Sequence, residues 1–232
     1  MQARRGYLPK DDRYFSSKAL ATLREASEHV RYLIDHGYDL KQASTFVGDH
    51  FQLADRQRMA IVRSVATDAQ LQGRRTKEVA VEDLRDREVW IDGFNTIITL
   101  EVMTCDSTLL ACMDGAVRDL AALRGTYRII PETADAIRLL FDVLEDARVC
   151  RATILLDEPV SNSGRLKALL AEVGEAYPFA LDVRVLGGVD RMLYGKENVV
   201  SSDSVVLDRC VSWVNMARHC MDLRHGQAIR VW

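Results

Sequence analysis

Three aspartates each follow a short apolar run and precede turn-forming residues. Asp92 follows VWI, Asp157 follows TILL, and Asp203 follows VVSS. Apolar runs of this length are typical of buried strands. The carboxyl ends of neighbouring parallel strands meet at one edge of a sheet, which is where α/β proteins place their ligands. We therefore expect the three carboxylates to cluster.

A cluster of carboxylates has a distinctive chemistry. Like charges raise one another's pKa or recruit a cation that offsets the repulsion. Mg²⁺ or Mn²⁺ suits such a site, because these ions bind through a few carboxylates together with waters and phosphate oxygens. A cation held in this way lowers the pKa of a bound water and neutralises charge on a phosphoryl group, so metal-assisted phosphodiester hydrolysis is the predicted reaction. The alternative is that each aspartate only caps the helix after its strand.

Other residues near these aspartates could hold a phosphate. A Ser-x-Ser-Gly turn after Asp157 leads into a predicted helix, where hydroxyls and backbone N–H groups can bind an anion. Ser163 could equally be a plain helix N-cap. Arg118, in the stretch DGAVRD, could clamp a phosphate or pair with a neighbouring acid, and the role of residues 114–119 stays open. The predicted phosphate-binding residues are Ser161, Ser163, Gly164, Arg118 and Ser202.

The second part of the chain alternates short apolar runs with helical segments. This pattern predicts an α/β domain over residues 87–232, with a mainly parallel sheet and flanking helices. Residues 72–86 are polar, mix charges and lack periodicity, so we predict a linker there. The predicted strands are 88–91, 152–156, 180–186 and 198–201, and the predicted helices are 116–123, 133–146, 164–176, 190–194 and 204–222.

Residues 1–71 are predicted to form a small helical bundle. Apolar residues recur at spacings of three and four from Leu20 to Ile34, and Gly37 ends that helix. Further helices are predicted over 40–47 and 54–71. Such a bundle resembles a helix-turn-helix, whose basic side chains contact phosphates, although solvated charges on a helix face would look the same. The predicted nucleic-acid contacts are Lys41, Arg56, Arg58 and Arg63.

The order of the acidic motifs resembles that of the PIN-like nucleases, particularly their NYN branch. The motif DGFN at 92–95 is similar to the turn that carries the first metal carboxylate in that superfamily, and SSD at 201–203 is similar to its later Ser/Thr-x-Asp motif. Asp157 matches a strand-end aspartate in the middle of that domain, and Asp190 falls where many members place another acid. The resemblance covers residues 87–222.

This resemblance implies a PIN/NYN-like α/β fold and a metal-dependent nuclease activity. It implies Asp92, Asp157 and Asp203 as metal ligands and Asp190 as a fourth acidic residue of the site. Asn95 would orient Asp92 or a metal-bound water. The whole chain also resembles two-part proteins of bacteria and archaea that begin with the domain-of-unknown-function family 434. That second resemblance implies the division into two parts and no activity.

Composition sets the remaining limits. The chain has 232 residues, 48% hydrophobic and 28% charged, which excludes a disordered or collagenous protein. No apolar stretch has the length of a membrane span, and the first residues lack an apolar signal core, so we expect a cytoplasmic protein with no membrane partner. The five cysteines show no Cys-x-x-Cys pair, which favours reduced thiols. P-loop, dinucleotide-binding and Gly-x-Ser-x-Gly motifs do not occur.

Three hypotheses follow from the sequence. The leading one is a Mg²⁺- or Mn²⁺-dependent nuclease that acts on RNA, with the basic face of the bundle guiding the strand. The second is a non-catalytic module that holds a nucleotide or RNA at the same acidic edge. The third is an interaction protein whose helical bundle recruits a partner. The sequence leaves the oligomeric state open, a homo-oligomer included.

Overall fold

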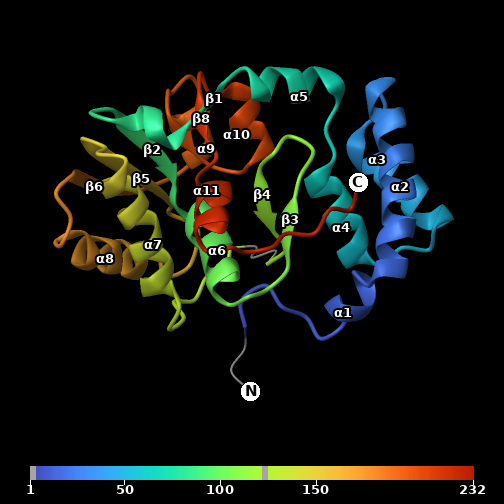
Figure 1. The fold of residues 1–232 in the computed structure, drawn as a ribbon, viewed down its shortest axis with the longest axis horizontal. Coiled ribbons are helices and arrows are strands. Elements are labelled where there is room, and N and C mark those ends of the chain that lie inside the picture. The colour runs from blue at the N-terminus through green and yellow to red at the C-terminus, as the bar shows by residue number, and fades with distance from the viewer. Residues whose placement is uncertain (1–3, 122–124) are drawn as a thin grey trace.

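The computed structural model describes residues 4–121 and 125–232, and a parallel sheet forms the centre of their second part (Figure 1). Its strands are β1 (Glu78–Val79), β2 (Glu88–Asp92), β5 (Arg151–Asp157), β6 (Ala180–Leu186), β7 (Val199–Val200) and β8 (Trp213–Val214). They lie in the order β1-β8-β7-β2-β5-β6, and every neighbouring pair is parallel. The predicted α/β class with a mainly parallel sheet is confirmed.

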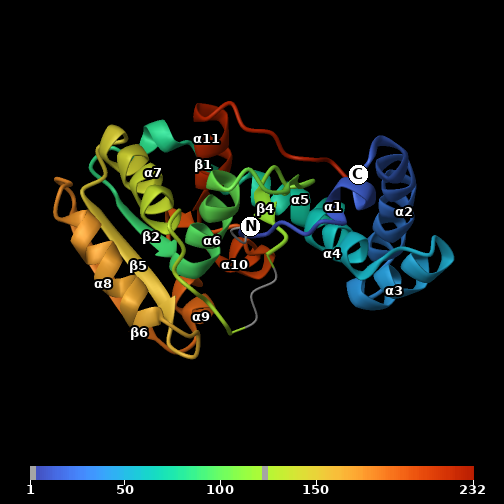
Figure 2. The same ribbon diagram turned by 90° about the horizontal axis from the view of Figure 1, so that it is seen from below.

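Helices cover both faces of this sheet. They are α6 (Gly93–Thr104), α7 (Thr133–Asp146), α8 (Ser163–Gly174), α9 (Val189–Leu193), α10 (Ser204–Arg209) and α11 (Met216–Leu223). Side chains alternate between the faces along a strand. Ile91 and Ile154 therefore pack into a core with α6, α7, α8 and α11, whereas Trp90 and Leu155 pack with α9 and α10. Figure 2 shows α7 and α11 on one side of β2 and α9 on the other.

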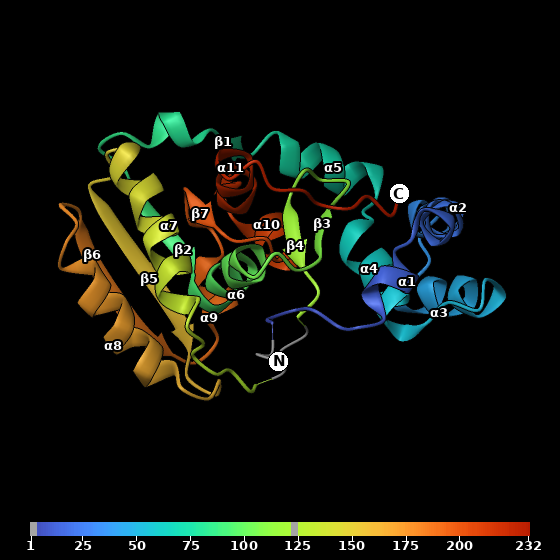
Figure 3. The same ribbon diagram turned by 60° about the horizontal axis from the view of Figure 1, so that its bottom comes forward.

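The N-terminal helices lie at the opposite end of the molecule from β6 and α8 (Figures 2 and 3). They are α1 (Asp11–Tyr14), α2 (Ser17–Asp35), α3 (Leu40–His50) and α4 (Asp55–Ser64). Helix α5 (Asp68–Arg75) follows and lies beside α10, where Arg74 donates to Asp208. The predicted helix over 54–71 is wrong, because the chain is extended at Val65 and a new helix starts after Thr67, whose hydroxyl accepts from the Gln70 N–H. Among the described residues, no helix combines the length and apolar character that a membrane crossing needs.

A hairpin and the last residues of the chain complete the core of the helical region. The hairpin consists of β3 (Leu109–Ala111) and β4 (Val117–Asp119), which are antiparallel. Ile229 forms a bridge with Leu110, and Val231 is fully buried among side chains of the helical region. The Ser27 hydroxyl donates to the Val231 carbonyl at 2.6 Å. The N-terminal helices, the hairpin and the chain end therefore share one hydrophobic core.

The secondary structure differs from the predictions in further segments. Helix α6 and strand β3 lie where no element was predicted. The predicted helix 116–123 is replaced by β4, since Gly115 (φ 85°) makes the hairpin turn, and its residues 122 and 123 lie outside the described chain. The predicted linker 72–86 contains the end of α5, strand β1 and a 3₁₀ helix, Val81–Leu84. The predicted helix 204–222 is divided into α10, β8 and α11, because Trp213 and Val214 pair with β7 and β1. The other predicted elements of the α/β part match within two residues.

Candidate functional site

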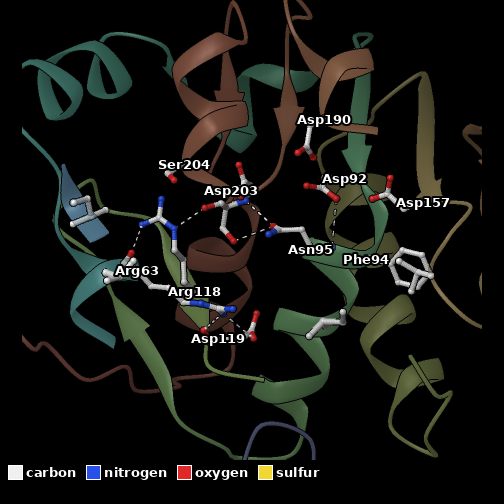
Figure 4. A pocket seen from close by; sticks show the side chains of 15 residues that line it. Arg63, Asp92, Phe94, Asn95, Arg118, Asp119, Asp157, Asp190, Asp203 and Ser204 are labelled. Carbon is white, nitrogen blue, oxygen red and sulfur yellow. Dashed lines mark hydrogen bonds and ion pairs between the residues drawn. The ribbon is translucent and has the colours of Figure 1, made fainter. Parts of the chain in front are cut away.

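Four aspartates line one cleft at the carboxyl edge of the sheet, with a volume of about 420 Å³ (Figure 4). Asp203 follows β7, Asp92 ends β2, Asp157 ends β5, and Asp190 lies in α9 directly after β6. These four strands are consecutive neighbours in the sheet. The chain runs outward from β2 to β5 and β6 and then returns to β7 on the other side of β2. The cleft therefore lies at the point where strand order reverses, the usual ligand position in such sheets.

Local structure fixes the Asp92 carboxylate. Asp92 is the N-cap of α6, and its Oδ1 accepts from the Asn95 N–H at 3.4 Å. The Ser201 hydroxyl donates to its Oδ2 at 2.9 Å. Gly93 allows α6 to start close to the sheet, because a Cβ at this position would lie 2.8 Å from the Leu155 carbonyl oxygen. The Asp-Gly pair thus has a packing role in addition to placing a carboxylate in the cleft.

Asp157 and Asp203 are also held by backbone groups. The Asp203 Oδ1 accepts from the N–H groups of Val205 (2.8 Å) and Val206 (3.1 Å) at the start of α10. The Asp157 Oδ1 accepts from the Val189 N–H at 3.3 Å. For Asp92 and Asp203, the capping role that the sequence left as an alternative is present. Capping leaves the second carboxylate oxygen of Asp203 available to the cleft.

The Asn95 side chain binds the loop that precedes Asp203. Its Oδ1 accepts from the Ser202 N–H at 2.8 Å and from the Ser202 hydroxyl at 2.9 Å. The side chain that donates to the Asp92 carboxylate is Ser201, and only the backbone N–H of Asn95 contacts it. Asn95 therefore connects α6 to the 201–203 loop, and the Ser202 hydroxyl is engaged in that contact.

The carboxylates perturb one another. Burial, with the nearby charges of Asp203 and Asp190, raises the pKa of Asp92 to about 7, although the Ser201 hydrogen bond lowers it. Burial and the charges of Asp203 and Asp157 raise the pKa of Asp190. No Lys or Arg of the described chain forms an ion pair with any of the four. This arrangement concentrates negative charge that a bound cation would relieve.

The four carboxylates do not form a ready-made metal cage. Within residues 4–121 and 125–232, no group of three or more His, Cys, Asp or Glu side chains is arranged so that it could hold a metal ion. Mg²⁺ commonly retains several waters and uses one or two carboxylates together with substrate phosphates. The donor set fits that mode of binding, in which the phosphate completes the coordination.

Arg118 pairs with a neighbouring acid, one of the two roles that the sequence left open. Its guanidinium donates to both carboxylate oxygens of Asp114, at 2.9 and 2.6 Å, and to the carbonyls of Ser202 (2.6 Å) and Arg63 (3.1 Å). Arg74 donates to the same Asp114 carboxylate at 2.7 Å. Arg118 lines the cleft but is buried, and these contacts use most of its donors. The prediction that it holds a phosphate is therefore corrected: its role is structural.

The Ser-x-Ser-Gly turn lies outside the cleft. The Ser161 hydroxyl donates to the Tyr127 carbonyl at 3.0 Å and accepts from the Tyr127 N–H. Asn162, with a left-handed backbone (φ 62°), is the N-cap of α8, so Ser163 is the first helical residue and not the cap. Ser161, Ser163 and Gly164 do not line the cleft, whereas Ser202 does.

Among the four predicted nucleic-acid contacts, Arg63 is the residue that lines the cleft. Arg56 is buried and forms an ion pair with Asp11 at 2.7 Å, so its predicted role as a phosphate contact is wrong. Arg58 donates to the Leu53 carbonyl and pairs with an acid of α3. Lys41 is exposed on α3, outside the cleft lining. Burial of an arginine cannot be deduced from helical spacing when its partner is distant in sequence.

Seven residues of the cleft lining were not predicted from the sequence. These residues are Leu40, Val62, Phe94, Ile98, Asp119, Val160 and Ser204. Asp119 accepts from the Thr99 hydroxyl at 2.9 Å and from the Ala121 N–H at 2.7 Å. Phe94 belongs to the DGFN motif. The sequence provides no local signal for the other six residues, because each comes from a different segment of the chain.

Comparisons with known proteins match two successive stretches of the chain to two families. Residues 22–77 match the family described as "Protein of unknown function (DUF434)", and residues 81–219 match "Domain of unknown function (DUF5616)". The "Uncharacterized protein MJ0935" of Methanocaldococcus jannaschii is 32% identical over 186 residues, which cover 80% of this chain and 89% of that protein. No solved structure matches. The expected resemblance to family 434 is confirmed, and the chain belongs to the family defined by these DUF434 and DUF5616 regions.

Proposed function

We propose that the protein is a metal-dependent phosphodiester hydrolase of the PIN/NYN type and that RNA is its substrate. The observation that carries the proposal is the set of four aspartates, one after each of four neighbouring parallel strands, in one cleft. No described Lys or Arg is paired with them. Carboxylates that merely cap helices need not share a cleft or raise one another's pKa.

Asp92, Asp157 and Asp203 are the proposed ligands of Mg²⁺ or Mn²⁺, with Asp190 nearby. Because no three of the described carboxylates are arranged as a metal site, one or two of them would hold the ion together with a substrate phosphate. A divalent cation at this position supplies a water of lowered pKa and neutralises charge on the phosphate. The chain itself contributes fixed ligand positions. The Ser201 hydroxyl and the Asn95 N–H hold the two oxygens of Asp92, so this carboxylate keeps one orientation when substrate arrives.

The test is cleavage of labelled RNA and single-stranded DNA in Mn²⁺ by the wild-type chain and by the Asp157→Asn and Asp203→Asn variants. Each substitution is nearly isosteric and keeps a side-chain oxygen for the backbone contacts. We expect each to reduce the rate by about 100-fold or more, because metal binding contributes several kcal/mol to the transition state. Asp146→Asn, at the exposed end of α7, is the matched control and should be fully active. Equal cleavage by all variants, or none by the wild type, would contradict hydrolysis.

A non-catalytic nucleotide- or RNA-binding module is the second candidate function. One observation favours it: among the described residues, no carboxylate group is arranged to hold a metal before a phosphate arrives. Such a module would be stabilised against heating by a metal–nucleotide complex without hydrolysing any nucleic acid. A thermal shift with nucleotide and Mn²⁺, together with unchanged RNA after prolonged incubation, would select this function. Cleavage that is lost in Asp203→Asn would reject it.

A further inference from the structure

The cleft that contains the four carboxylates has a second wall, formed by the N-terminal helices. Leu40 at the start of α3 and Val62 and Arg63 near the end of α4 line it. Val62 is 37% exposed, so an apolar β-branched side chain faces the cleft instead of packing fully into a core. Phe94 and Ile98 of α6 line the cleft as well. The cleft therefore combines an acidic part with an apolar part.

Arg63 forms an ion pair with Asp119 and gives this wall a guanidinium with unused donors. Its Nη1 donates to the Asp119 carbonyl and lies 3.3 Å from the Asp119 Oδ1. Its Nε and Nη2 donate to no residue that the structure describes, and the side chain is 32% exposed. In Figure 4, Arg63 and Asp119 lie on the left and lower side of the cleft and Asp157 lies on its right side. A guanidinium with free N–H groups is suited to a phosphate oxygen.

Buried contacts fix the two walls relative to each other. Arg118 donates to the Arg63 carbonyl in α4 and to the Ser202 carbonyl beside Asp203. Asp114 holds the same guanidinium through two oxygens. Because this group is buried and charge-paired, the helical wall is a preorganised part of the cleft.

We propose that the helical wall selects the substrate unit next to the scissile phosphate. A nucleobase packs against Val62 and Leu40, the phosphate attached to that nucleotide accepts hydrogen bonds from Arg63, and the next phosphate reaches the carboxylates. Bases pack on apolar side chains, and phosphates take guanidinium donors. A cleft of about 420 Å³ has the size of a site for one small ligand, which suits a single nucleotide unit. The inference rests on the proposed function and assigns recognition to a region outside the carboxylate edge.

The test is a binding measurement by fluorescence anisotropy with a short labelled oligouridylate in Mg²⁺. All proteins carry Asp203→Asn, which keeps an N-cap for α10 and prevents turnover under the proposed function. Val62→Asn should weaken binding about fivefold because it removes apolar contact with the base. Arg63→Gln should weaken it about tenfold because it removes a charge-assisted contact. The matched controls are Val211→Asn and Arg24→Gln, exposed positions outside the cleft, whose effects should stay within about twofold.

A second probe separates base contact from charge. An oligomer of the same length without bases should bind more weakly than the oligouridylate, and Val62→Asn should cause no further loss with it. Equal effects of Val62→Asn on both probes, or unchanged binding in Val62→Asn and Arg63→Gln, would overturn the inference. Val62-dependent binding by a chain that cleaves no RNA would refute hydrolysis and support the helical wall. RNA cleavage by the chain with Asp203 intact, together with binding that Val62→Asn leaves unchanged, would support hydrolysis and refute the role of the helical wall.

Discussion

Asp92→Asn should stabilise the protein at alkaline pH and leave it nearly unchanged in acid. Asp92 is buried, and its pKa rises from 3.8 to about 7 in the folded chain. One pKa unit corresponds to 1.36 kcal/mol, so the ionised carboxylate destabilises the folded state by about 4 kcal/mol above pH 7. The penalty is absent below the unfolded pKa and develops as pH rises through the folded value. Asparagine removes the charge and keeps an acceptor for Ser201 and the cap of α6.

Urea unfolding at pH 4 and pH 8.5, followed by tryptophan fluorescence, measures this effect. The expected gain in unfolding free energy is about 4 kcal/mol at pH 8.5 and close to zero at pH 4. Asp146→Asn should show no gain at either pH. Mn²⁺ should reduce the gain if it binds the wild-type carboxylates, because the ion then stabilises the wild type. A gain that is equal at both pH values, or a loss at pH 8.5, would refute the assignment of a strained, buried charge at Asp92.

Three further predictions concern stability. Arg5→Met should lower the unfolding free energy by about 3 kcal/mol, because it leaves the fully buried Glu101 without its ion-pair partner at 2.8 Å. Burial already raises the pKa of Glu101. The loss measured by urea unfolding should therefore shrink as pH falls and Glu101 becomes protonated. Gly93→Ala should cost about 1–3 kcal/mol, because its Cβ would lie 2.5 Å from Leu156 Cδ2, and calorimetry showing no loss would contradict the close approach of α6. Val231→Ala should cost about 2 kcal/mol in urea unfolding through a cavity in the helical core, and a neutral result would show that the chain end contributes little.

The strands that carry the aspartates could be predicted from the sequence because each is a continuous apolar run buried on both faces. The central residues of β2, β5 and β7 have this pattern, and the carboxylates follow from the rule that parallel strands share one edge. The edge strand β6 is only partly buried and is interrupted by Asp182 and Arg184. The meeting of Asp92, Asp157 and Asp203 in one cleft required only the strand ends and a parallel sheet. Asp190 came from the family resemblance, because nothing in its own short helix marks it.

What could not be predicted depends on contacts between distant residues. β1 and β8 have two residues each, too few for a periodic signal, and exist because they pair with each other. Arg118 and Arg56 are of a residue type that commonly contacts phosphate. In the folded chain they form buried ion pairs with Asp114 and Asp11 instead. The helical wall of the cleft is invisible locally, since Val62 has the same spacing as core residues of α4. Tertiary packing decides which of these side chains reach the surface.

The burial of Val231 beneath α2 has a consequence for how the chain acquires its structure. During translation the N-terminal helices leave the ribosome first, but Leu23, Ala26 and Val30 stay incompletely covered until the hairpin and residues 229–231 arrive. The stretch matched by the first family is therefore an incomplete folding unit, and its final consolidation waits for residues 229–231. An excised 1–77 fragment should consequently populate a loosely packed, aggregation-prone state.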